Sequence, residues 1–244
     1  MSYLTIVARA LSHVMPSRTA ALGAVLAVGG ALAAGGANAN LLTNGSFETP
    51  TVPVGGITNF SVGEAGLTGW NVIGPNGATV ALISGSFTQN GVTFNAGDGA
   101  QWLDLTGNGS NGPEGVSQAV ATKAGELYQL AFLVGNTSGG GIFGSTSTVD
   151  VLLTGTQTFA DTNSNADPTG QNWEQFTQQF VATGATTTLA FLNGDTLSDN
   201  DNGLDDIVLL DLGPGTISVP EAPTLLLIVT ALLGLAWSQR RRAI

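Results

Sequence analysis

The chain has 244 residues, and its charge is unevenly distributed: five of its six basic residues lie near the ends, so residues 40–218 hold one lysine against sixteen acidic residues, a formal charge of −15. Such an acidic segment repels phosphates, which excludes nucleic-acid binding through basic patches. The chain has no cysteine, and its one histidine is His13. Disulfides, thiolate metal sites and a serine–histidine–aspartate triad are therefore excluded after residue 39, which leaves carboxylate chemistry, hard-cation binding or binding without catalysis.

The first 39 residues have the features of a secretory signal peptide. Two arginines precede an apolar run at residues 20–34, and Ala37 and Ala39 form a small-x-small cleavage motif. We expect cleavage after Ala39. A retained membrane anchor is the alternative, but the run is rich in alanine and glycine, which makes it a weak permanent span.

Residues 40–212 are expected to form one all-β domain. Asn-Gly turn signals recur, and no stretch of ten residues has an apolar period of 3.6. Residues 127–134 alternate most clearly between apolar and polar side chains. Further strands are expected at 101–105, 114–120, 149–153, 173–182, 187–192 and 204–212, with polar loops at 136–148 and 162–171 and a linker at 213–218. Short strands without intervening helices predict an antiparallel jelly-roll β-sandwich.

Residues 219–244 combine a short polar motif, an apolar run and a basic cluster. The apolar run covers residues 223–237, and the groups on either side of it are Val219, Pro220, Glu221 and Ala222 before it and Arg240, Arg241 and Arg242 after it. About fifteen helical residues span roughly 22 Å, which is short for a hydrocarbon core of about 30 Å, but arginine side chains can snorkel. The arginines predict a transmembrane helix with its C-terminus in the cytoplasm, so the domain lies outside.

This tail resembles the PEP-CTERM sorting signal, although Ala222 stands where that family usually has a second proline. The resemblance implies processing by an exosortase, a membrane cysteine protease-transpeptidase that cuts near the motif. It implies a protein in the inner membrane with a periplasmic domain before processing, and at the cell surface or in the extracellular matrix afterwards. A plain single-pass tail anchor is the alternative.

The domain also resembles a known kind of fold through the order of its motifs. Asn44-Gly45-Ser46-Phe47-Glu48 opens it and Leu204-Asp205-Asp206-Ile207 closes it. It is similar to galactose-binding-like jelly rolls: carbohydrate-binding modules, the related domain of unknown function of plant cell-wall proteins, and bacterial choice-of-anchor proteins. In such modules a structural calcium ties the first strand to the last, which implies ligands at Glu48 and at Asp205 or Asp206.

Strand alternation bears on the same two aspartates. It places Asp206 on one face with Leu204 and Asp205 on the other with Ile207, so one carboxylate is expected to point toward the core. Because a buried unpaired charge is costly, a cation would stabilise it there. Solvation at a frayed strand end is the alternative, and the choice between the two aspartates as ligand stays open.

Three further patterns bear on function. The acidic run at residues 195–206 suggests a looser second cation site, although a solvated acidic turn is the favoured interpretation. A glycosidase needs two carboxyl groups facing one sugar, and the candidate pairs, which no motif singles out, are Asp98 with Asp104 and Glu114 with Glu126. Aromatic platforms for sugar rings could come from Trp70, Trp102 and Trp173, for which core packing is the more common role.

The sequence therefore predicts an exported, surface-sorted and non-catalytic β-sandwich protein that is adhesive or associated with polysaccharide. Its expected partners are an exosortase-like protease and a polysaccharide, with calcium as a structural cofactor. The alternatives are a structural matrix protein without a specific ligand and a carboxylate-based polysaccharide hydrolase.

Overall fold

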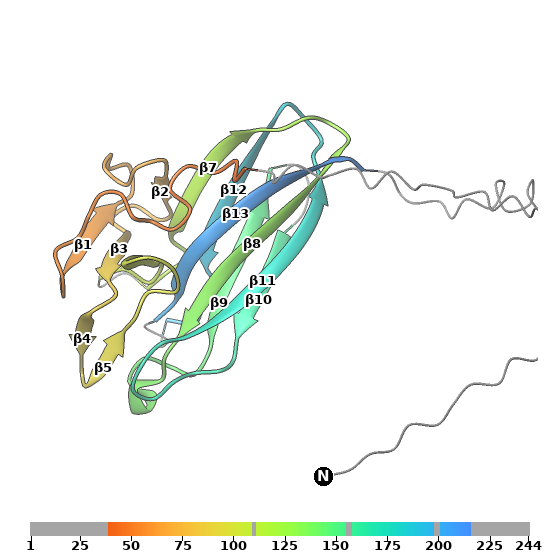
Figure 1. Cartoon of the computed structure of the whole chain (residues 1–244). Coiled ribbons are helices and arrows are strands. Elements are labelled where there is room, and N and C mark those ends of the chain that lie inside the picture. Colours follow the sequence, from red (N-terminus) through yellow and green to blue (C-terminus); the bar gives the residue numbers. More distant parts are fainter. Residues whose placement is uncertain (1–38, 109–110, 155–157, 198–200, 216–244) are drawn as a thin grey trace, which may run out of the picture. The chain divides into compact units, whose positions relative to one another are not determined.

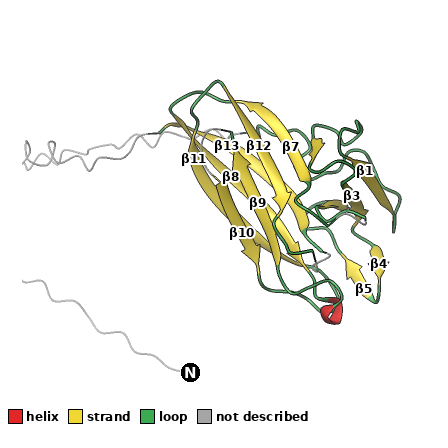
Figure 2. Cartoon of the chain, turned by 180° about the vertical axis from the view of Figure 1, so that it is seen from behind, coloured by secondary structure: helices red, strands yellow, loops and turns green. Residues whose placement is uncertain are grey.

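The computed structural model describes residues 39–108, 111–154, 158–197 and 201–215, which form two facing β-sheets and a short hairpin (Figures 1 and 2). The six-stranded sheet has the spatial order β1 (Ile57–Ser61), β3 (Thr79–Ser84), β6 (Gln101–Asp104), β13 (Gly203–Pro214), β8 (Glu126–Asn136) and β11 (Asn172–Val181). The five-stranded sheet has the order β10 (Thr158–Asn163), β9 (Ser147–Leu153), β12 (Thr186–Asn193), β7 (Gly115–Ala121) and β2 (Asn71–Ile73). The hairpin pairs β4 (Phe87–Gln89) with β5 (Val92–Phe94).

All pairs of named strands are antiparallel, which confirms the predicted all-β antiparallel fold class. Each of the seven predicted strands is present within about two residues of its expected bounds. The last strand ends at Pro214, so the predicted linker starts two residues too early. The other strands, which the sequence analysis did not predict, are β1, β2, β3, β4, β5 and β10.

The targeting segments lie almost entirely outside the described residues. Of the cleavage motif, Ala39 is described and exposed, whereas Ala37 is not described. The apolar run at 223–237 and the groups around it are also outside the described residues, namely Val219, Pro220, Glu221, Ala222, Arg240, Arg241 and Arg242. In the part of the chain that the structure describes, no helix is long and apolar enough to cross a membrane.

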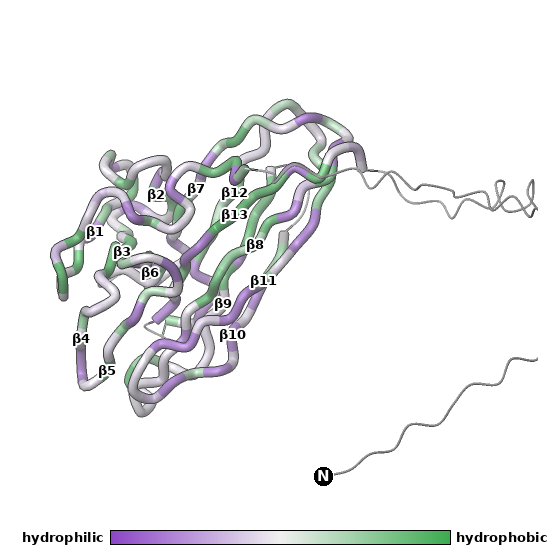
Figure 3. Tube along the Cα trace, viewed as in Figure 1, coloured by the Kyte–Doolittle hydropathy of each residue, from purple (hydrophilic) through white to green (hydrophobic). Residues whose placement is uncertain are grey.

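One continuous hydrophobic core lies between the two sheets. Strand β8 alternates in burial, so Leu130, Phe132 and Val134 point inward while the residues between them are half-buried. The ring of Phe132 lies 5.4 Å from that of Phe191 on β12 in the opposite sheet. Burying one such ring contributes roughly 1.5–3 kcal/mol. Hydrophobic residues accordingly run along β8 and β13, whereas the edge strand β11 is mostly hydrophilic (Figure 3).

A β-bulge in β13 changes the predicted alternation at the two aspartates. Pairing with β8 shifts register between Asp205 and Val208, and Asp206 adopts a positive φ of 43°. The extra residue brings Ile207 into the core together with Leu204. The prediction that Asp206 shares a face with Leu204 and Asp205 with Ile207 is therefore wrong. Asp205 is fully buried on the outer side of the sheet, and Asp206 is half-buried.

Candidate functional site

Residues 40–45, which precede β1, lie along the last strand, β13. Leu41 N–H donates to the Leu209 carbonyl at 2.9 Å, and Ile207 N–H donates to the Gly45 carbonyl at 3.0 Å. The Asn40 side chain donates to the Ile207 carbonyl and accepts from Leu209 N–H, both at 2.9 Å. The first and last segments of the domain are therefore neighbours, as the resemblance implies.

The opening Asn-Gly-x-Phe-Glu motif holds this segment in place. The Asn44 amide donates to the carbonyls of Thr49 and Thr68, and the Asn44 carbonyl accepts from the indole N–H of Trp70. A Cβ on Gly45 would lie 2.1 Å from the Ile207 carbonyl oxygen, so only glycine permits the close approach to β13. Phe47 is fully buried in the core. These residues of the motif are structural.

Glu48 and Asp205 together hold the loop at residues 97–101, here called the clamped loop. Glu48 Oε1 accepts from Ala100 N–H at 2.8 Å and from Gln101 N–H at 3.0 Å. Asp205 Oδ2 accepts from Gly97 N–H at 3.0 Å and from Asp98 N–H at 2.9 Å. Burial raises the pKa of Asp205 to about 8, although these backbone N–H groups and that of Asp206 lower it.

These contacts bear on the predicted calcium site. Within the described ranges, no group of three or more aspartate, glutamate or histidine side chains is arranged to hold a metal ion. Glu48 and Asp205 border the same loop. Their oxygens named above accept hydrogen bonds from backbone N–H groups, an arrangement that suits a carboxylate acting as a hydrogen-bond acceptor rather than as a cation ligand. Burial, followed by the charge of Asp98, raises the pKa of Asp206. The geometry fits a loop clamp, and calcium bound by Glu48, Asp205 or Asp206 stays a prediction.

The acidic run at residues 195–206 is partly buried. Asp195 Oδ1 accepts from Thr148 N–H at 2.7 Å, and Asp201 Oδ2 accepts from Thr137 N–H at 2.9 Å. Asp201 is 2% exposed, and Asn202 is fully buried. The interpretation of this run as a solvated turn is therefore wrong at Asp201 and Asn202. Residues 198–200 lie outside the described part of the chain.

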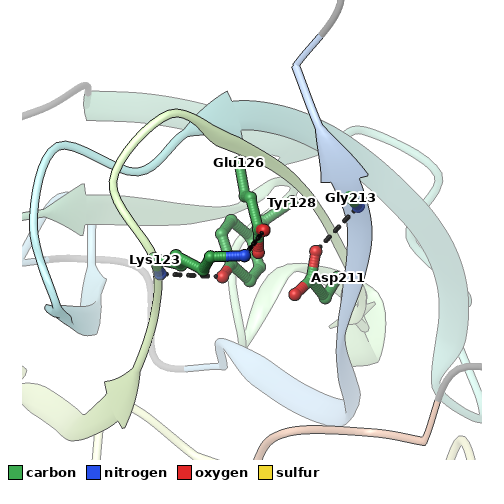
Figure 4. A network of polar contacts seen from close by, with 5 residues as sticks. All are labelled: Lys123, Glu126, Tyr128, Asp211 and Gly213. Carbon is green, nitrogen blue, oxygen red and sulfur yellow. Dashed lines mark hydrogen bonds and ion pairs between the residues drawn. The ribbon is translucent and has the colours of Figure 1, made fainter.

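The pair Glu114 and Glu126 does not form one site. Glu114 is buried just before the start of β7, and Glu126 lies beyond the other end of that strand, where it forms an ion pair with Lys123 (Figure 4). This ion pair raises the pKa of Lys123. Tyr128 Oη accepts from Lys123 N–H at 3.0 Å, and burial raises the pKa of the phenol. The network stabilises the β7–β8 turn.

A cavity of about 300 Å³ lies on the outer side of the six-stranded sheet, and we call it the aromatic cavity. Ile83 and Trp102 on β3 and β6 form its floor, and they belong to a second cluster of buried hydrophobic residues outside the main core. The β4–β5 hairpin and the loop after β8 cover this cluster. They contribute three aromatic rings to the cavity, those of Phe87, Phe94 and Phe143.

Phe94 is the centre of the aromatic wall. Its ring centroid lies 5.2 Å from Phe143, 5.9 Å from Phe87 and 6.0 Å from Trp102. Phe87 is half-buried and Gln89 exposed, so this wall extends from the buried floor to the cavity mouth. Such rings offer flat apolar faces that stack on other rings.

Two acidic residues, Asp104 and Asp201, also line the aromatic cavity. Asp104 Oδ1 accepts from Thr106 N–H at 2.9 Å and from the Thr106 hydroxyl at 2.7 Å. Burial, with a smaller contribution from the charge of Glu114, nonetheless raises the pKa of Asp104 to about 7. The cavity therefore combines aromatic walls with a carboxyl group that titrates near neutral pH.

The sequence analysis named only part of this site. Trp102 and Asp104 were candidates, whereas Phe87, Phe94 and Phe143 were not. One signal was available: Asn90-Gly91 separates two short alternating segments, and both residues have positive φ, 51° and 82°, as a two-residue hairpin turn requires.

The other two candidate tryptophans have different surroundings. Trp70 is buried in the main core, 5.9 Å from Phe191. Trp173 is half-buried, and its ring lies 5.9 Å from Trp102 without lining the aromatic cavity. Of the three, only Trp102 contributes to the cavity.

Comparison with known proteins places the chain in a family. Residues 40–207 match the family described as "Protein of unknown function (DUF642)", and the chain belongs to that family. Among curated proteins, none matches the chain.

Solved structures with a similar fold include a cyclase from Fischerella sp. TAU, with 18% identity and a TM-score of 0.52 over 72% of this chain and 97% of that chain. The CBM22-1 xylan-binding domain from Paenibacillus barcinonensis Xyn10C has 18% identity and a TM-score of 0.37 over 66% of this chain and 97% of that chain. A second module of carbohydrate-binding family 16 has 19% identity and a TM-score of 0.41 over 70% of this chain and 99% of that chain. At 18% identity and a TM-score of 0.52, the likeness to the cyclase concerns the fold alone.

Proposed function

We propose that the protein is an exported, non-catalytic surface protein whose β-sandwich domain binds polysaccharide in the aromatic cavity. The observation that carries this proposal is the meeting of an aromatic wall and carboxyl groups in one open cavity. Sugar rings present apolar faces that stack on aromatic side chains, and their hydroxyl groups donate hydrogen bonds to carboxylates. The exposed side chains of Gln89 and Asn108 at the mouth supply further hydrogen-bonding groups.

Binding to polysaccharide is tested with a glycan array and the purified full-length protein. We expect binding to one class of polysaccharide, weakened about tenfold by Phe87→Ala because the half-buried ring is lost from the wall. The matched control is Phe176→Ala, which removes a half-buried ring on β11 that does not line the cavity. A blank array with well-folded protein would favour the alternative of a structural matrix protein without a specific ligand.

Export and surface sorting form the second part of the proposal. They rest on the signal-like residues 1–39 and the PEP-CTERM-like tail at 219–244. We expect the mature N-terminus to be Asn40 and the tail to be cut near Pro220-Glu221 by an exosortase. Mass spectrometry of the surface fraction measures both ends. A tail that is retained in a host with an active exosortase would favour the plain tail anchor.

Hydrolysis of polysaccharide is a second candidate function, because Asp104 and Asp201 line the same cavity and Asp104 titrates near neutral pH. A glycosidase uses one such carboxyl group as a general acid. Release of reducing ends from a bound polysaccharide, abolished by Asp104→Asn, would establish this function. Binding without release of sugar would support the non-catalytic proposal.

A further inference from the structure

The aromatic cavity has a strongly one-sided charge. Asp104 and Asp201 line it, and among the described residues no basic side chain does. Lys123 is the one lysine of the chain and lies in the β7–β8 turn, and all arginines are outside the described residues. The surrounding domain is strongly acidic as well. The field in the cavity therefore attracts a cation and repels an anion.

A neutral sugar would add no positive charge to this acidic cavity. Displacing water from the two carboxyl groups costs free energy unless a positive group replaces it. The Thr137 N–H that donates to Asp201 and the Thr106 groups that donate to Asp104 carry no net charge. A bound ammonium group would compensate the carboxylates and would also favour the ionised form of Asp104.

The walls suit the same kind of ligand. Phe87 is half-buried at the edge of the cavity, whereas Phe94 and Trp102 lie behind it, 4% and 0% exposed, so Phe87 is the most accessible of the three rings. Aromatic faces attract cations and stack on ring-shaped molecules. A volume of about 300 Å³ is at the lower end of the range for small-molecule sites. The cavity therefore accommodates one positively charged ring of a polysaccharide rather than several consecutive sugars.

We propose that the aromatic cavity binds a protonated amino-sugar ring, as found in polysaccharides with free amino groups, through the Asp104 and Asp201 carboxylates and the half-buried ring of Phe87. This inference rests on the proposed polysaccharide binding and specifies its substrate class. The shared chemistry is a six-membered ring with an ammonium group, so a small cyclic amine would meet the same recognition.

Titration calorimetry of the purified full-length protein tests the proposal with three probes: a glucosamine hexamer, the N-acetylglucosamine hexamer and cyclohexylammonium. We expect the glucosamine hexamer to bind at least about tenfold more tightly than its acetylated counterpart, because acetylation removes the charge. Binding of the glucosamine hexamer without cyclohexylammonium assigns the site to a sugar. If both the glucosamine hexamer and cyclohexylammonium bind, the recognised feature is the ammonium group on a six-membered ring.

Two variants locate the binding. Asp104→Asn keeps the shape of the side chain and is expected to weaken binding of the glucosamine hexamer about tenfold. Phe87→Ala, at the half-buried edge of the wall, is expected to weaken it as well. Glu64→Gln removes the same charge from an exposed loop and is expected to leave the affinity unchanged.

Equal affinity for the two hexamers, or an unchanged affinity in Asp104→Asn, would overturn the proposal. If a neutral polysaccharide binds in the aromatic cavity instead, the proposed function stands and the amino-sugar inference fails. If cyclohexylammonium binds and no polysaccharide does, the cationic site stands while the proposed polysaccharide function fails.

Discussion

At the scale of the residue, Asp104 makes stability depend on pH in the direction opposite to that of a typical surface aspartate. Its pKa is about 7 in the folded protein, against an ordinary aspartate value of 3.8, so the folded state binds the proton more tightly than the unfolded chain does. The stabilising contribution is present below pH 4 and is lost as pH rises through 7. At pH 8, the free energy of unfolding of Asp104→Asn, measured by denaturant titration, should therefore exceed that of the wild type by on the order of 2–4 kcal/mol. At pH 4 the two should not differ. Glu64→Gln is the control, and parallel stability curves for Asp104→Asn and wild type would contradict the prediction.

Glu48 provides a second test at this scale, because it separates a loop clamp from a calcium ligand. Glu48→Ala removes two backbone hydrogen bonds from the clamped loop and should cost about 2 kcal/mol in unfolding free energy without added metal. If calcium binds there, millimolar calcium raises the wild-type melting temperature and leaves that of Glu48→Ala unchanged. A wild-type melting temperature that is the same in calcium and in chelator would contradict the predicted calcium site.

At the scale of the element, the β4–β5 hairpin is a separate packing unit on the outer side of the sheet. Phe94 joins it to Trp102 and Phe143, so Phe94→Ala removes its main anchor. We expect hydrogen exchange to show lost protection in β4 and β5 with retained protection in β8. Phe191→Ala, in the main core, should instead lower protection throughout, at a cost of roughly 3–5 kcal/mol. Equal loss of protection in β8 and the hairpin of Phe94→Ala would show that the hairpin does not open separately.

At the scale of the whole molecule, the domain depends on the contact between its first segment and β13. Gly45→Ala would push that segment away from the Ile207 carbonyl and should destabilise the whole domain by about 3 kcal/mol. Gly184→Ala is the matched control, because its nearest neighbour would be 3.8 Å from the new Cβ. Thermal unfolding of both variants measures the difference, and similar melting temperatures would contradict the role given to Gly45.

The fold was more predictable from the sequence than the candidate site. Strand β8 has one face in the core and one near solvent, so its side chains alternate. Strand β3 was not predicted because it is buried on both faces: Leu82 packs in the main core, and Ile83 packs under the hairpin. The burial of Asp201 depends on a contact with Thr137, 64 positions away, which no local pattern encodes.

The solitary lysine of the chain has a practical consequence for presenting the protein on a surface. The Lys123 side chain is 76% exposed, in a turn at the opposite end of the sandwich from the β4–β5 hairpin (Figure 1). With the N-terminal α-amino group blocked, amine-reactive coupling would tether every molecule through the Lys123 side chain, at the end of the sandwich away from the β4–β5 hairpin (Figure 1). Biosensor chips and affinity beads prepared in this way would carry uniformly oriented domains.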